Sequence, residues 1–145
     1  ARRESSSQLT LIMRLPLIAL MVDEPSYELS FSLRHVAAVL DGSRASLRAL
    51  SVLKDFAQRY GSRITVIYQG SDDEFLALVK ESMSKAGITY TVEKPSDLLE
   101  FIRIKAPDLL VLPLEGRTGA EALEAAGPIL SALAYTESSI LVLRY

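Results

Sequence analysis

The chain has 145 residues, of which 49% are hydrophobic and 23% are charged, with a formal net charge of -2 and a pI near 5.5. This composition is typical of one globular domain with a hydrophobic core, and it gives no electrostatic reason to expect nucleic acid or an anionic membrane as a partner. The absence of cysteine excludes disulfides and thiolate nucleophiles and fits a reducing compartment, so we expect a cytoplasmic protein.

Residues 1–33 form an N-terminal extension whose most apolar stretch, residues 9–22, contains Arg14 and Pro16. A membrane span needs about 20 apolar residues, so this stretch is too short, and we expect no direct membrane insertion. Residues 8–14 indicate a short helix and residues 15–22 an apolar strand, while residues 23–26 read as a linker. Residues 27–33 are expected to form an extended link or an added edge strand.

The extension is similar in pattern to residues 130–143, the last helix and strand of the chain. The shift between the two segments is about 121 residues, which is close to the length of one domain. We therefore expect that the chain begins inside the tail of a preceding copy of the same domain. Chance similarity between two short apolar segments is the alternative.

Strands and helices alternate over residues 34–145. The apolar, β-branched runs predict strands over residues 36–40, 64–68, 88–93, 109–112 and 140–143. The third of these is the most polar, so it is expected near a sheet edge. Pro113 is expected to bound the fourth. The single histidine, His35, is read as a strand-entry residue, and it cannot by itself form a metal site.

The segments between the strands have helical periodicity. They predict helices over residues 45–60, 72–86 and 95–106, with Ser71 as the N-cap of the second. Because proline breaks a helix interior, Gly127-Pro128 divides the last helical region in two, one helix ending near Ala126 and another running from Pro128 to Tyr135. Alternating strands and helices predict an α/β fold: an open, doubly wound, mostly parallel five-stranded sheet with helices on both faces. Ligands of such folds bind at the carboxyl ends of the strands.

Several segments resemble the universal stress protein family in their order and spacing. They are residues 36–43 (VAAVLDGS), 45–49 (ASLRA), 86–88 (AGI), 106–112 (APDLLVL), 116–119 (GRTG) and 140–143 (ILVL). The resemblance covers residues 34–145, one whole domain, and it implies the fold just described. It also implies an adenine-nucleotide site in those members that bind ATP. Mapped onto this sequence, the site that the resemblance implies comprises Asp41, Gly42, Ser43, Gly116, Arg117, Thr118, Gly119 and Gly127.

The phosphate-binding part of that motif departs from the family pattern. Nucleotide-binding members have a glycine, two residues, a second glycine, nine residues and then Gly-Ser or Gly-Thr. Here Pro113 replaces the first glycine, the third is displaced to Gly127, and Pro128 stands where a hydroxyl is needed. Proline has no N–H to offer a phosphate. We therefore expect no cofactor, with ATP or AMP doubted.

The link after the second strand of the domain is also short, and three carboxylates follow it at Asp72, Asp73 and Glu74. They would repel a triphosphate, or they simply favour the start of a helix. Asp41 matches the family aspartate that lies beside the adenosine. Its local interpretation is a residue that turns the chain and caps the next helix.

The two ends of the chain carry apolar strands that need neighbours, because an unpaired apolar edge invites pairing. In the family the last strand often pairs across a dimer axis. We expect the N-terminal strand either to pair with the last strand or to exchange into a second chain. The residues expected in this pairing are Leu17, Ala19, Leu20, Ile140, Leu141, Val142 and Leu143.

These observations favour a non-catalytic regulatory or interaction domain that acts through homodimer or tandem-copy pairing, with fusion to a transporter as one parent architecture. The sequence contains no nucleophile–base constellation, so no catalytic residue is predicted. The alternative is a nucleotide-binding stress sensor. An unrelated doubly wound enzyme is a third class, and it would need acid–base residues that converge at the strand ends.

Overall fold

The computed structural model of the protein describes residues 9–12, 33–115, 119–133, 136 and 138–144. These residues form a six-stranded sheet in the order β1-β6-β5-β2-β3-β4. The strands are β1 (Leu9–Ile12), β2 (His35–Leu40), β3 (Arg63–Tyr68), β4 (Tyr90–Glu93), β5 (Leu109–Leu114) and β6 (Ser139–Arg144). Strands β2 to β6 are parallel, and β1 runs antiparallel to β6. The predicted five-stranded parallel sheet is therefore confirmed, with one further strand at its edge.

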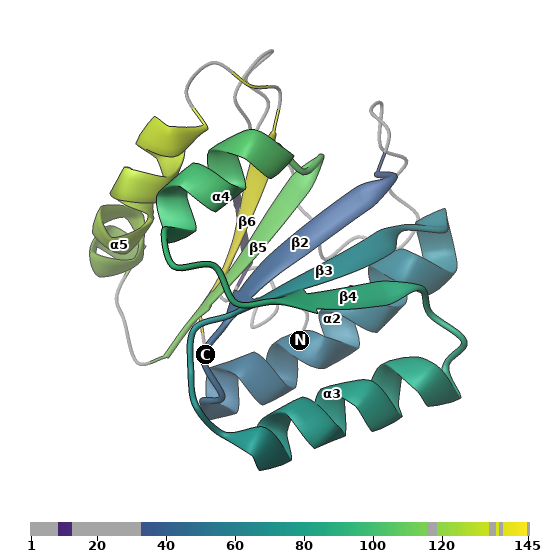
Figure 1. Cartoon of the computed structure of the whole chain (residues 1–145). Coiled ribbons are helices and arrows are strands. Elements are labelled where there is room, and N and C mark those ends of the chain that lie inside the picture. The colour runs from purple at the N-terminus through teal and green to yellow at the C-terminus, as the bar shows by residue number, and fades with distance from the viewer. Residues whose placement is uncertain (1–8, 13–32, 116–118, 134–135, 137, 145) are drawn as a thin grey trace, which may run out of the picture.

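Helices cover both faces of this sheet. They are α2 (Arg44–Tyr60), α3 (Asp73–Lys85), α4 (Leu98–Lys105) and α5 (Gly119–Ala132). Figure 1 shows α2 and α3 on one face and α4 and α5 on the other. Successive strand residues point to opposite faces, so Val36 and Ala38 pack with α2 and α3, while Ala37 packs with α4 and α5. The chain thus has two hydrophobic cores separated by the sheet.

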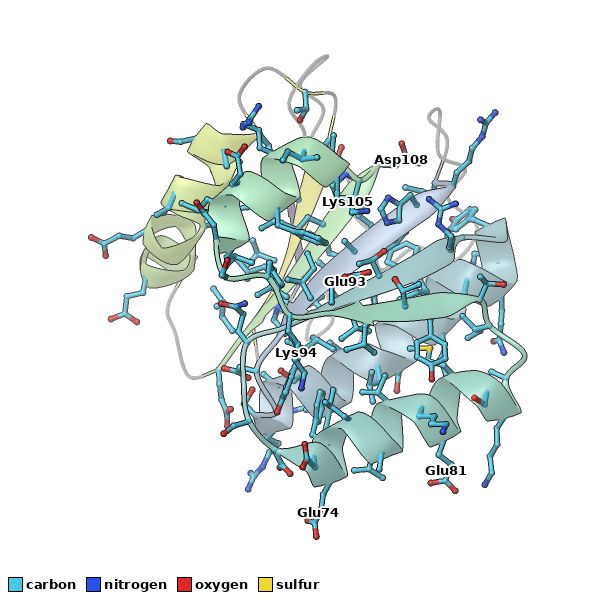
Figure 2. All side chains as sticks on the ribbon, in the orientation of Figure 1. Glu74, Glu81, Glu93, Lys94, Lys105 and Asp108 are labelled. Atoms are coloured by element: carbon cyan, nitrogen blue, oxygen red, sulfur yellow. The ribbon has the colours of Figure 1, made fainter. Side chains whose placement is uncertain are left out.

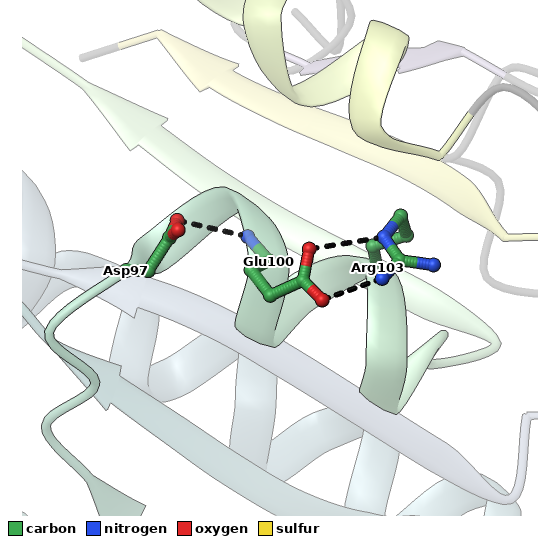
Figure 3. Close-up of polar contacts among 3 residues, drawn as sticks. All are labelled: Asp97, Glu100 and Arg103. Carbon is green, nitrogen blue, oxygen red and sulfur yellow. Dashed lines mark hydrogen bonds and ion pairs between the residues drawn. The ribbon is translucent and has the colours of Figure 1, made fainter.

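Polar side chains and a glycine cap the helix termini. In α2 the Ser46 amide donates to the Ser43 hydroxyl over 3.2 Å, and Gly61 ends the helix at φ 69°. In α4 the Glu100 amide donates to the Asp97 carboxylate over 3.1 Å, and the Glu100 side chain pairs with Arg103 on the next turn (Figure 3). These contacts satisfy backbone groups that a helix end leaves without partners.

Several predictions about single elements are wrong. Leu9–Ile12 is a strand rather than a helical segment, because pairing with β6 outweighs the weak preference of a short isolated helix. The N-cap of α3 is Asp72 instead of Ser71, since its carboxylate accepts from the amides of Glu74 and Phe75. Helix α5 runs without a break through Gly127-Pro128. Gly127 has no Cβ to collide with the proline ring, so the residue before Pro128 can adopt the helical conformation more easily than another residue would.

Pro113 lies inside β5 instead of bounding it. The Ser139 amide of β6 donates to the Asp108 carbonyl, just before β5, so this carbonyl faces β6. The amide of the next residue, Leu109, points the opposite way, toward β2. Because amide directions alternate along a strand, the nitrogen of Pro113 also faces β2. Pairing between β5 and β2 ends at Val111. The missing N–H of Pro113 therefore removes no bond from the sheet.

None of the helices described is long and apolar enough to cross a membrane.

Candidate functional site

The carboxyl ends of β2 and β3 lie side by side, because the two strands are paired in parallel from His35–Arg63 to Leu40–Tyr68. Residues 41–43 connect β2 to α2, and residues 69–72 connect β3 to α3. The Gln69 amide donates to the Leu40 carbonyl over 2.8 Å, which joins the two turns at their base. These turns form the described part of the expected ligand-binding edge.

The Asp41 carboxylate is bonded within its own turn. Its Oδ1 accepts from the Ser43 amide over 3.0 Å and from the Ser46 hydroxyl over 2.9 Å. The Asp41 amide in turn donates to the Ser46 hydroxyl over 2.9 Å. Partial burial raises the pKa of Asp41, but these hydrogen bonds outweigh it and hold the pKa below its ordinary value. The predicted turning role of Asp41 is the one that the geometry shows, but the predicted capping role is wrong, because the N-cap of α2 is Ser43.

Gly42 and Gly70 bring the backbones of the two turns close together. Gly42 has φ 85°, and a Cβ there would meet the Tyr68 hydroxyl at 3.4 Å. A Cβ on Gly70 would lie 2.7 Å from the Asp41 carbonyl oxygen and 2.7 Å from the Tyr68 hydroxyl. Real Cβ atoms do not approach other atoms so closely, so Gly70 is required by packing. The β3–α3 turn is pressed directly against the β2–α2 turn.

Tyr68, the last residue of β3, fills the space beside these turns. Its hydroxyl accepts from the Asp72 amide over 2.6 Å and donates to the Asp72 carbonyl over 3.2 Å. Its ring stacks on Phe75 at 5.7 Å between centroids, and the Lys94 ammonium lies 5.7 Å from the ring centre. Only 2% of the surface of Tyr68 is exposed, so its side chain fills the space between β3, α3 and the residue that follows β4.

The predicted nucleotide-site residues separate into three groups. Asp41, Gly42 and Ser43 lie together in the β2–α2 turn, whereas Gly116, Arg117 and Thr118 lie outside the described residues. Gly119 begins α5, and Gly127 lies eight residues further along the same helix. At 1.5 Å per residue this places the two glycines about 12 Å apart along the helix axis. Gly127 is therefore not at a helix N-terminus, where free amides bind phosphate.

The sequence places Tyr68 at this edge, as the last residue of the predicted strand 64–68, but sequence reasoning missed its packing role and the contact of Ser46. An aromatic residue at the end of a buried strand, followed two residues later by glycine, was the available signal for Tyr68. The hydroxyl of Ser46 stands one turn into α2, where only the three-dimensional fold brings it back to Asp41.

A second polar cluster lies at the opposite end of the sheet. The Asp108 carboxylate accepts from the amides of Arg34 and His35 over 2.9 and 3.0 Å, and His35 Nε2 lies 2.7 Å from the Thr65 hydroxyl. Figure 2 shows Asp108 and Lys105 at the end of the sheet away from Lys94. Burial and the Arg63 charge lower the pKa of His35. The strand-entry interpretation of His35 is confirmed.

The β6 edge is the third candidate region. Ile140, Leu141, Val142 and Leu143 are all 0% exposed. They pair with Ile12, Leu11, Thr10 and Leu9, respectively. The partner strand is thus β1 instead of the predicted residues 15–22. Leu17, Ala19 and Leu20 lie outside the described residues, so their pairing stays a prediction.

No cluster of three acidic or histidine side chains suited to a metal ion occurs in the part of the chain that the structure describes. A groove of about 460 Å³ lies between α2 and α3, away from the turns, and is lined by Lys54, Leu78, Glu81, Ser82, Lys85 and Ala86.

Comparison with solved structures identifies the fold as that of the universal stress proteins. A universal stress protein from Archaeoglobus fulgidus is 15% identical with a TM-score of 0.57, and the match covers 77% of this chain but only 44% of that one. A universal stress protein in complex with cAMP is 18% identical with a TM-score of 0.54, over 78% of this chain and 98% of that one.

A universal stress protein family member from Burkholderia pseudomallei is 20% identical with a TM-score of 0.51, over 78% of this chain and 96% of that one. No protein-family model and no curated sequence matches the chain. The resemblance seen in the sequence is thereby confirmed at the level of the fold: the chain is a domain of universal stress protein architecture.

Proposed function

We propose that this domain is a non-catalytic regulatory or interaction module of the cytoplasm, and that it acts by strand pairing at the β6 edge. The observation that carries the proposal is the character of that edge. Four consecutive residues, 140–143, are fully buried and apolar, and an antiparallel strand occupies the side that the parallel sheet leaves open. A terminal strand of this kind is suited to a second copy or a tandem copy.

The turns at the carboxyl ends of β2 and β3 support the non-catalytic part of the proposal. Asp41 is engaged by Ser43 and Ser46, and Tyr68 closes the space between the turns. The four-residue link 69–72 offers little chain to cover a nucleotide. Pro128 lies inside α5 and has no amide for a phosphate. We therefore propose that the domain holds neither ATP nor AMP as a cofactor.

A nucleotide sensor is the second candidate, and the cAMP complex of a structural neighbour favours it. Asp41, Gly42 and Ser43 would then lie beside the adenosine, as the family resemblance implies. In this case binding depends on the Asp41 carboxylate exchanging its internal bonds for bonds to the ligand.

Calorimetric titration with ATP, ADP, AMP and cAMP, with and without magnesium, separates the two candidates. We expect no saturable heat at ligand concentrations up to about 1 mM, which corresponds to a binding free energy weaker than about -4 kcal/mol. Saturable micromolar binding that is lost in Asp41→Ala but kept in Asp55→Ala would establish the sensor instead. Asp55 is a suitable control because it is an exposed carboxylate on α2.

A further inference from the structure

The β6 edge is already occupied within the chain, and this has a consequence for the proposed pairing. Strand β1 belongs to the N-terminal extension, and residues 13–34 separate it from β2. In the sheet order β1 is nevertheless adjacent to β6, three strands away from β2. A segment outside the domain proper thus lies where a second copy would pair.

The register fixes which backbone groups hold β1 in place. The Ser139 amide donates to the carbonyl of Asp108, directly before β5. Amide directions alternate along a strand, so the Leu141 amide also faces β5, whereas the amides of Ile140 and Val142 face the other way, toward β1. Their register partners are Ile12 and Thr10. Opposite pairs in an antiparallel ladder alternate between hydrogen-bonded and non-hydrogen-bonded pairs, and the two residues of a hydrogen-bonded pair exchange both bonds. The amides of Thr10 and Ile12 therefore face β6, and that of Leu11 faces away.

The contact is short. β1 has four residues, whereas β6 has six, and Ser139 and Arg144 are not among the residues paired with β1. A ladder with two such hydrogen-bonded pairs contributes only a few kcal/mol, because each hydrogen bond has a net value of about 1 kcal/mol. Its advantage is that the two strands belong to one chain, since tethering gives an effective concentration on the order of millimolar.

We propose that β1 is a displaceable cover strand that regulates the β6 edge by competing in cis with β6 of a second copy of this chain. This inference rests on the proposed function, since it assigns a regulator to the same edge. Two β6 strands that run antiparallel about a two-fold axis present the same residues to each other, so the edge is self-complementary. The six-residue β6 strand offers a second copy a longer ladder than β1 provides. Release of β1 therefore favours the dimer.

Proline substitutions test the cover strand with a matched pair of variants. Thr10→Pro removes an amide that faces β6, whereas Leu11→Pro removes one that faces away, where proline is tolerated on an edge strand. In sedimentation equilibrium we expect the dimer dissociation constant of Thr10→Pro to fall about thirtyfold relative to the wild type, because each of the two protomers loses one hydrogen bond of about 1 kcal/mol to its cover strand. Leu11→Pro should stay within about twofold of the wild type.

A reversible lock gives the reverse test in a folded protein. Because the sequence has no cysteine, Leu9→Cys/Leu143→Cys is the only thiol pair in that variant. These positions form a non-hydrogen-bonded pair, whose Cα separation of about 4.5 Å suits a disulfide. The oxidised protein should be a closed monomer that does not dimerise, and reduction should restore association.

The outcomes separate the inference from the proposed function. If Thr10→Pro exposes the Ile140 and Val142 amides to hydrogen exchange yet remains monomeric at every concentration, the proposed pairing function is wrong. If the locked and reduced proteins dimerise equally, pairing stands and the cover strand is wrong. Disulfide-linked dimers in place of closed monomers would show that β1 is supplied by a second chain, which also overturns a cover in cis.

Discussion

The two edges of the five-stranded parallel sheet, β4 and β6, differ in length, chemistry and pairing. β4 is a four-residue strand, and none of its residues is fully buried; Glu93 and Lys94 place charges at its carboxyl end (Figure 2). β6 has six residues, and its central four are apolar and fully buried. Short, charged edges resist pairing with other chains, whereas long apolar edges invite it. The difference indicates that β4 terminates the sheet, whereas β6 is suited to pairing with a further strand.

The largest expected effect on stability comes from a charge placed on β6, and a charge placed on β4 is the matched comparison. Val142→Asp puts a carboxylate among the apolar residues that pack with α5, so we expect it to lower the free energy of unfolding by more than about 3 kcal/mol. Thr91→Asp on β4 is exposed, and its effect should stay within about 0.5 kcal/mol. Urea denaturation followed by circular dichroism measures both. Equal losses in the two variants would remove the distinction between the edges.

Tyr68→Phe tests whether the β4 side of the sheet is held by internal contacts. The substitution removes the hydroxyl that bonds to both backbone groups of Asp72, leaving a part-buried amide without its acceptor. We expect a loss of about 1–2 kcal/mol in the free energy of unfolding. Tyr90→Phe, on the partly exposed β4 strand, is the control and should change stability by less than about 0.5 kcal/mol. If the two variants are alike, the Tyr68 hydroxyl does not join β3 to α3.

Asp41→Asn asks whether the β2–α2 turn depends on a charged carboxylate. The pKa of Asp41 is lowered in the native state, so the charged form stabilises the fold above the ordinary pKa of an aspartate, and this contribution is lost as the pH falls through the lowered value. We expect a loss of about 1 kcal/mol at pH 7 that shrinks toward pH 3. Chemical denaturation across this pH range provides the measurement. A loss that is independent of pH would contradict the assigned role of the charge.

Substitution of His35, which lies at the amino end of the strands, should have the smallest effect on stability. Its pKa is lowered in the native state, so the unfolded chain binds more protons as the pH falls below the ordinary value of 6.5. Stability should therefore decrease between pH 7 and pH 5, with part of the decrease absent in His35→Gln. The charged groups that act on His35 are Arg63, Asp108 and Lys105, so Lys105→Gln serves as a charge control that retains the histidine. An identical pH profile for the wild type and His35→Gln would rule out this contribution.

The sequence predicted the elements whose signals are local. The helices predicted over residues 45–60 and 72–86 are present as α2 and α3, and the polar segment before Lys94 is an edge strand. The errors arose where a distant neighbour decides the structure. Residues 9–12 are a strand because β6 lies beside them, and Pro113 is accommodated because β2 has already ended its pairing with β5.

The candidate site was predictable only in part for the same reason. Asp41 and Gly42 could be placed from the turn sequence, but the role of Tyr68 depends on Gly70 and Asp72 in the turn that follows it and on Lys94, which follows β4. Spacing along the chain carries no signal for the contact with Lys94. The continuous α5 helix likewise moved Gly127 away from the helix start at which the motif had placed it.

Residue-resolved hydrogen exchange is the most direct test of the difference between the two edges. The amides of Ile140 and Val142 face β1, whereas those of Tyr90 and Val92 face outward from β4, since the Thr89 carbonyl is the one that accepts from Ile64 in β3. We predict strong protection at Ile140 and Val142 and fast exchange at Tyr90 and Val92. Fast exchange at all four amides would show that the β6 edge is open and unpaired, and it would contradict a domain that works through that edge.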